Sequence, residues 1–141
     1  MILPALLAAA ALAAAPIKGA TYRGTLSGAR AKITIRFRVS AGATQVQNLR
    51  IASLPIYCSG NGPPGAPHIS FANARISASG SFSSRGKDMI TTGPLKSSVV
   101  ATLLITGTFA RDGKESGTVT TTYAGTAKQC GGHSTYTTSS G

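Results

Sequence analysis

Residues 32–39 alternate strictly between polar and apolar side chains. A period of two places successive side chains on opposite faces of a β-strand, whereas an amphipathic helix would require apolar residues three or four positions apart. We therefore predict a half-buried strand whose outward face is basic. The apolar set is Ile33, Ile35, Phe37 and Val39, and it alternates with Lys32, Thr34, Arg36 and Arg38.

The remaining sequence favours an all-β fold of one domain. Thr and Ser with scattered Val and Ile favour short strands joined by turns, and a chain of 141 residues suits one domain. We predict an antiparallel β-sandwich or a partly closed barrel of about eight strands over residues 21–141. Residues 99–109 are apolar on both faces, so this strand should run through the middle of the domain. Other strand patterns cover 46–56, 69–71, 118–123 and 134–138.

The N-terminal part of the chain carries an uncharged apolar run at residues 2–15, followed by Pro16 and Lys18. The run is shorter than the roughly 20 residues of a membrane-spanning helix and is typical of the apolar region of a signal peptide. We predict that residues 1–20 form a signal helix and a short linker, with cleavage after Ala13 or after Ala15. The protein is then expected to be secreted or to lie in the cell envelope.

Two cysteines, Cys58 and Cys130, fit an oxidising compartment. An even pair in an exported chain most simply forms a disulfide, which would stabilise the fold by about 4 kcal/mol for a loop of this length. The same cysteines together with His68 and His133 could instead bind Zn²⁺ tetrahedrally. Export favours oxidation of the thiols, so we predict the disulfide, no bound metal and no cofactor.

The chain is strongly basic, with a net charge of +11 from 14 Lys and Arg against three acids. The positive electrostatic field of such a chain attracts anionic polymers and surfaces, although the same charge also keeps a small domain soluble and monomeric. Alternate side chains of a strand lie about 7 Å apart on one face, so a row of cations could follow a polyanion. We predict that such a row binds an anionic cell-envelope polymer or a membrane surface. Its residues are Arg30, Lys32, Arg36 and Arg38.

Residues suited to catalysis are few. The three acids, Asp88, Asp112 and Glu115, lie near Lys or Arg in predicted turns, where neighbouring cations would lower their pKa values. We therefore expect solvated turn residues rather than a general acid, and a protein that is not an enzyme.

Two other functions remain open. A small secreted hydrolase could use His68 or His133, although the sequence has no Gly-x-Ser-x-Gly nucleophile motif. A protease inhibitor could present the proline-rich loop from Cys58 to Pro67.

The aromatic residues argue against specific nucleic-acid binding. The four Phe lie in apolar strand patterns and are expected in the core. Recognition of single strands would require aromatic rings interleaved with the basic row, and no tyrosine alternates with that row. The tyrosines, which we expect at the surface, are Tyr22, Tyr57, Tyr123 and Tyr136.

One short motif occurs twice: Gly-x-Phe-x3-Gly-Lys followed by an acid, at residues 80–88 and 107–115. We predict that each copy forms a strand, a turn and a strand. Gly86 and Gly113 would then supply the positive-φ position of the two turns.

Several of these features also occur together in a known group of proteins. The pattern Tyr22-x-Gly24-x4-Gly28, the alternating strand that ends at Val39, the Gly-x-Phe strands and the two cysteines resemble a group of small, uncharacterised secreted actinobacterial proteins. The resemblance covers most of the chain after residue 20 and consists of strand and turn residues. It implies a secreted β-rich domain with one mid-chain and one late cysteine, and it brings no catalytic residue.

Overall fold

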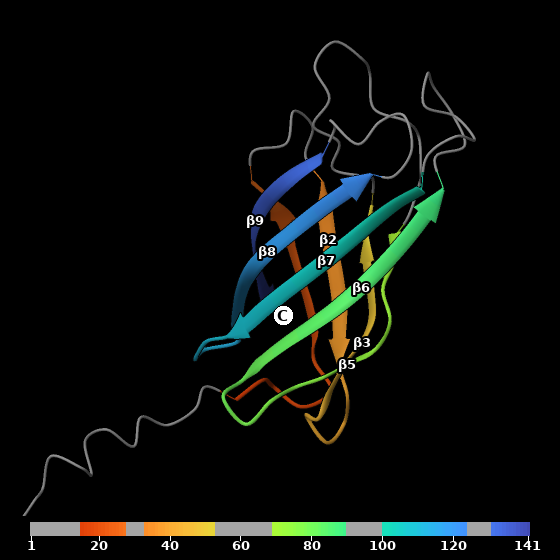
Figure 1. Ribbon diagram of the computed structural model, residues 1–141. Helices are drawn as coiled ribbons and strands as arrows, with labels where there is room; N and C mark the ends of the chain where they lie inside the picture. Colours follow the sequence, from red (N-terminus) through yellow and green to blue (C-terminus); the bar gives the residue numbers. More distant parts are fainter. Residues whose placement is uncertain (1–14, 28–32, 53–68, 90–99, 124–130) are drawn as a thin grey trace, which may run out of the picture.

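The computed structural model of the chain describes residues 15–27, 33–52, 69–89, 100–123 and 131–141 (Figure 1). Within these ranges all regular secondary structure is β, and the predicted signal helix falls in residues 1–14, outside them. None of the described residues belongs to a helix with the length and apolar character needed to cross a membrane. The strands are β1 (Thr21–Leu26), β2 (Thr34–Val39), β3 (Gln45–Ile51), β4 (Ile69–Ser70), β5 (Ala74–Arg75), β6 (Ser81–Met89), β7 (Val100–Phe109), β8 (Lys114–Tyr123) and β9 (Gly131–Ser140).

The strands form one antiparallel sheet that curls into a nearly closed barrel (Figure 1). Neighbouring strands follow the order β4-β3-β2-β1-β9-β8-β7-β6, and β6 returns to the segment that holds β4 and β5. There Phe71 and Gly86 form a β-bridge, and the N–H of Ala72 donates to the carbonyl of Arg85 at 3.2 Å. Of the two predicted architectures the structure is therefore the barrel. The strand predicted to run through the middle, β7, lies between β6 and β8.

β4 and β5 occupy a single position in the barrel wall. Arg50 pairs with Ser70 and Gln45 pairs with Arg75, so both short strands keep the same register against β3. The chain leaves the strand conformation between β4 and β5, near Phe71, and there it also pairs with β6. Counting β4 and β5 as one, the barrel has eight wall positions, which agrees with the predicted number of strands.

Gly86 permits the closure between β6 and this segment. A Cβ at Gly86 would lie 3.0 Å from Cδ2 of Phe71, so the aromatic ring packs directly on the glycine backbone. Gly86 lies within β6, and the prediction that it forms a hairpin turn is wrong. The second copy of the motif does form the predicted turn, because Gly113, with a φ of 69°, joins β7 to β8.

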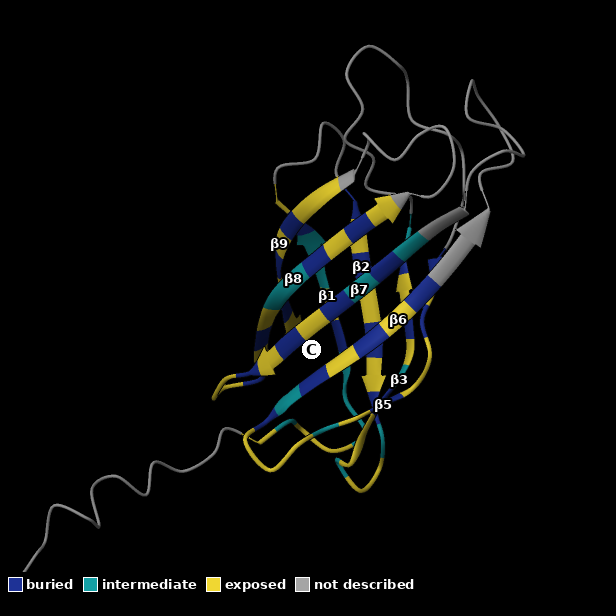
Figure 2. Ribbon diagram, in the orientation of Figure 1, coloured by how far each residue is buried: buried dark blue, intermediate teal, exposed yellow. Residues whose placement is uncertain are grey.

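Buried and exposed residues alternate along the strands (Figure 2). The four predicted apolar residues, Ile33 just before β2 and three within the strand, are buried, whereas Arg36 and Arg38 are exposed. The four Phe are all buried, as predicted. The rings of Phe37 and Phe109 pack on the ring of Tyr22, with centroid separations of 5.1 Å and 5.2 Å. Such aromatic contacts contribute beyond the burial of their surface area.

Tyr22 and Tyr136 are buried in this core (0% and 1% exposed), so the prediction that they lie at the surface is wrong. A tyrosine is tolerated inside a protein when its hydroxyl group finds a hydrogen-bond partner. The Tyr22 hydroxyl accepts a hydrogen bond from the N–H of Ile17 at 3.1 Å, and the Tyr136 hydroxyl donates to the Glu115 carboxylate at 2.5 Å. Tyr57 and the side chain of Tyr123 lie outside the described part of the structure.

Candidate anion-binding site

Four exposed arginines gather on the outer face of β1, β2 and β3. Cross-strand pairing places Arg23 opposite Arg36, and Arg36 opposite Arg50. Because neighbouring strands lie about 4.8 Å apart, these three residues form a row roughly 10 Å long. Arg38 lies two residues further along β2, on the same face. These four residues are named the arginine cluster.

A β-bulge in β3 places Arg50 on the outer face. Two residues of β3, Asn48 and Leu49, together oppose the single residue Phe37, and the register shifts at this point. Asn48 takes up the irregularity with a φ of 53°, in the left-handed region that asparagine tolerates better than most residues. Val46 before the bulge and Leu49, the second residue of the bulge, both point inward. The alternation therefore changes phase, and Arg50 faces the solvent instead of the core.

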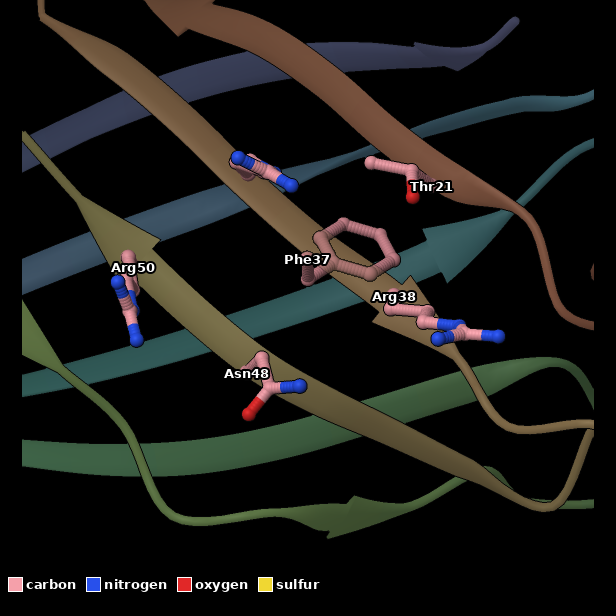
Figure 3. A pocket seen from close by; sticks show the side chains of 6 residues that line it. Thr21, Phe37, Arg38, Asn48 and Arg50 are labelled. Carbon is pink, nitrogen blue, oxygen red and sulfur yellow. The ribbon is translucent and has the colours of Figure 1, made fainter.

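A hollow of about 320 Å³ lies at the bulge (Figure 3). In Figure 3, Asn48 and Arg50 come from β3, Arg38 from β2 and Thr21 from β1. The ring of Phe37 is buried, so the polar lining of the hollow comes from the other residues. The lining residues are Thr21, Arg36, Phe37, Arg38, Asn48 and Arg50.

The acids whose side chains the structure describes do not balance the charge of the cluster. Glu115 lies inside the barrel, and Asp112 lies in the turn between β7 and β8. Like charges that face each other directly on neighbouring strands destabilise a sheet. The Arg23–Arg36 and Arg36–Arg50 pairs are both of this kind. An anion bound across the cluster would offset this repulsion, so the arrangement favours an anionic ligand.

The structure places two of the four predicted anion-binding residues in this cluster. Arg36 and Arg38 lie side by side on the outer face, as predicted, whereas Arg30 and Lys32 lie outside the described residues. The sequence analysis missed Arg23 and Arg50. Arg23 could have been found from the period of two around Tyr22, but the bulge that turns Arg50 outward leaves no clear sequence signal.

The residues of the alternative functions are only partly described. His133 lies exposed on β9 and pairs with Thr120 of β8. Since Glu115 points into the barrel, the histidine and this acid lie on opposite faces of the wall. His68, Cys58 and the loop that follows it lie outside the described residues, as does Cys130, so the disulfide stays a prediction.

Glu115 is an acidic side chain in the barrel interior, at the start of β8 (1% exposed). Its carboxylate accepts hydrogen bonds from the hydroxyl groups of Tyr136 at 2.5 Å and Thr138 at 2.6 Å. Gly107 of β7 leaves room for this group, because a Cβ there would overlap with Oε2 of Glu115 and approach the Tyr136 hydroxyl. The carboxyl group is thus enclosed by three strands.

Burial raises the pKa of Glu115 from 4.5 to about 7, although the hydrogen bonds from Thr138 and Tyr136 act in the opposite direction. The prediction that Glu115 is a solvated turn residue with a lowered pKa is therefore wrong. Asp88 also lies in a strand, because β6 extends to Met89. Only Asp112 occupies a turn as predicted.

The outward side of β7, β8 and β9 carries mainly hydroxyl groups, together with Leu104, Lys114 and His133, and its hydroxyl-bearing residues are named the hydroxyl wall. Cross-strand pairs of threonine run across it, and the hydroxyl groups of Thr106 and Thr118 lie 3.0 Å apart. In the barrel order, β6 to β8 lie opposite β1 to β3, so much of this wall lies across the barrel from the arginine cluster. Its members are Thr102, Thr106, Thr108, Ser116, Thr118, Thr120, Thr122, Thr135, Thr137 and Ser139.

No known protein family has a model that matches this chain, and no curated protein or solved structure is significantly similar to it. The geometry of the arginine cluster therefore carries the functional argument.

Proposed function

We propose that this chain is a non-catalytic secreted or cell-envelope β-barrel that binds an anionic polymer through the arginine cluster. The observation that carries the proposal is the cross-strand alignment of Arg23, Arg36 and Arg50. Guanidinium groups stay charged at physiological pH and bind carboxylates or phosphates through two parallel hydrogen bonds. A line of such groups on a rigid sheet favours an extended anion over a single small ion.

The surroundings of the cluster favour a polymer over a membrane surface. Protein surfaces that bind membranes combine cations with exposed apolar side chains that enter the lipid. Thr21 and Asn48 border the arginines instead. Among the described residues the exposed large apolar side chain is Ile17, which precedes β1 and lies near Gly113. Export is supported by the apolar run at residues 2–15. The proposal needs no second subunit, and we expect a monomer.

Binding to a soluble polyanion, measured as a function of salt, tests this function. We expect the affinity to fall at least about tenfold as salt rises from about 50 mM to about 500 mM, because the attraction is electrostatic. The variants Arg36→Gln and Arg50→Gln should weaken binding. Arg111→Gln removes the same charge from the exposed turn between β7 and β8, which lie across the barrel from β2 and β3, and should have little effect. The proposal would be refuted if the affinity for the polyanion did not change with salt, or if all three variants lost the same amount of affinity.

A further inference from the structure

We propose that the hollow at the Asn48 bulge is a phosphate subsite, so that the polymer bound by this protein carries phosphate groups rather than carboxylates. The inference rests on the proposed function, because it specifies the ligand of the same surface. The phosphate would be held by Arg36, Arg38 and Arg50, with Asn48 and Thr21 at the rim of the hollow.

The number of donors around the hollow favours phosphate. Each guanidinium group offers five N–H donors, and the Asn48 amide and the Thr21 hydroxyl add further donors. A carboxylate has two oxygens, and one or two arginines can satisfy it. A phosphate group has more acceptor oxygens, arranged in three dimensions. Three guanidinium groups around one hollow therefore suit a tetrahedral anion better than a planar one.

The charge of the hollow supports the same ligand. Arg36 and Arg50 face each other on neighbouring strands, and Arg38 lies about 7 Å further along β2. A single carboxylate would compensate one of these three positive charges. A terminal or pendant phosphate carries a charge of up to about −2, whereas a phosphate within a chain carries about −1 and adds further oxygens that accept hydrogen bonds. Arg23, next to Arg36 but outside the hollow, is placed to meet a neighbouring phosphate of the same chain.

The hollow also has a suitable size and a fixed shape. Its volume of about 320 Å³ leaves room for a phosphate group and its linking atoms. The residues that line it lie on three paired strands, and the Asn48 backbone is held by the bulge. Little backbone ordering is therefore required on binding.

Titration of the purified protein with inorganic polyphosphate and with polyglutamate of equal chain length, at equal ionic strength, tests the inference. We expect polyphosphate to bind at least about tenfold more tightly. Arg50→Lys keeps the positive charge but loses the planar guanidinium group and its paired N–H donors. The preference for polyphosphate should therefore fall to about threefold or less, while salt-dependent attraction to both polymers persists. Arg111→Lys, in the exposed turn between β7 and β8, is the matched control and should keep the wild-type preference. Circular dichroism melts establish that both variants fold.

The outcomes separate this inference from the proposed function. Equal affinity for the two polymers, with both weakened by Arg36→Gln, would overturn the phosphate subsite and leave the proposed function intact. Loss of salt-dependent binding to both polymers in the wild type would overturn the function and the inference together. Tighter binding to vesicles that contain phosphatidylglycerol than to polyphosphate would assign the phosphate to a lipid headgroup and overturn the polymer as its source.

Discussion

Replacement of Glu115 by glutamine tests whether one buried acid controls the stability of the barrel. The carboxyl group is enclosed, and its pKa is raised from 4.5 to about 7 in the folded chain. Glutamine has nearly the same shape and is uncharged at every pH, so it resembles protonated glutamic acid. The Glu115→Gln variant should therefore form the same barrel without the pH response of this group.

The sign of the effect follows from the two pKa values. The folded chain binds the proton more tightly than the unfolded chain, so the contribution of Glu115 to stability is fully present below pH 4.5. This contribution is lost as the pH rises through about 7, because the ionised carboxylate is poorly solvated inside the barrel. The difference between the two pKa values corresponds to about 3 kcal/mol of unfolding free energy. That is a large part of the stability of a small domain.

Urea unfolding followed by circular dichroism at pH 5 and at pH 8 measures this contribution. Between these two pH values the wild type should lose about 2.5 kcal/mol more unfolding free energy than Glu115→Gln. Asp112→Asn, which removes the exposed acid of the β7–β8 turn, is the matched control for the loss of one carboxylate. If the wild type and Glu115→Gln gave parallel pH profiles within about 0.5 kcal/mol, the reasoning from burial to pKa would be refuted.

Three further substitutions test neighbouring features. Gly107→Ala should lower the unfolding free energy by about 3 kcal/mol or more in a denaturant titration, because the Cβ of the alanine would overlap with the Glu115 carboxylate. An unchanged denaturation midpoint would contradict the close approach of this carboxylate to the Gly107 backbone. Tyr136→Phe removes a hydrogen-bond donor to the same carboxylate, so it should lower the unfolding free energy by about 1–3 kcal/mol at pH 8 and by less at pH 5. An equal loss at the two pH values would exclude a hydrogen bond to the ionised carboxylate. Cys58→Ser combined with Cys130→Ser should lower the unfolding free energy by about 4 kcal/mol if the predicted disulfide forms, and an equal melting temperature for the oxidised and reduced wild type would exclude it.

The parts of the fold that depend on local pattern could be predicted from the sequence. The burial of Phe37 and the exposure of Arg36 follow directly from an alternation of period two within one strand. Arg50 could not be placed in this way, because the bulge at Asn48 reverses the alternation inside β3. The row of arginines depends in addition on which strands pair and in which register. Neither property is encoded in any single segment.

Glu115 illustrates a second kind of failure. Its sequence neighbours, from Arg111 to Lys114, are typical of an exposed turn, and the chain does turn there. Its environment is set by more distant partners, since Tyr136 and Thr138 supply its hydrogen bonds from β9 and Gly107 leaves space for it on β7. Local charge therefore predicted a lowered pKa where desolvation by other strands raises it.

The outward face of β1 to β3 carries four arginines, whereas the outward face of β7 to β9 carries one lysine, Lys114, among its threonines and serines, so positive charge is denser on one side of the barrel. On approach to a polyanion the barrel would rotate until β1 to β3 face the ligand, before any specific contact forms. A layer of barrels adsorbed in this single orientation would present threonine and serine outward. An ionic surface would thus acquire a hydrated coat of lower charge density.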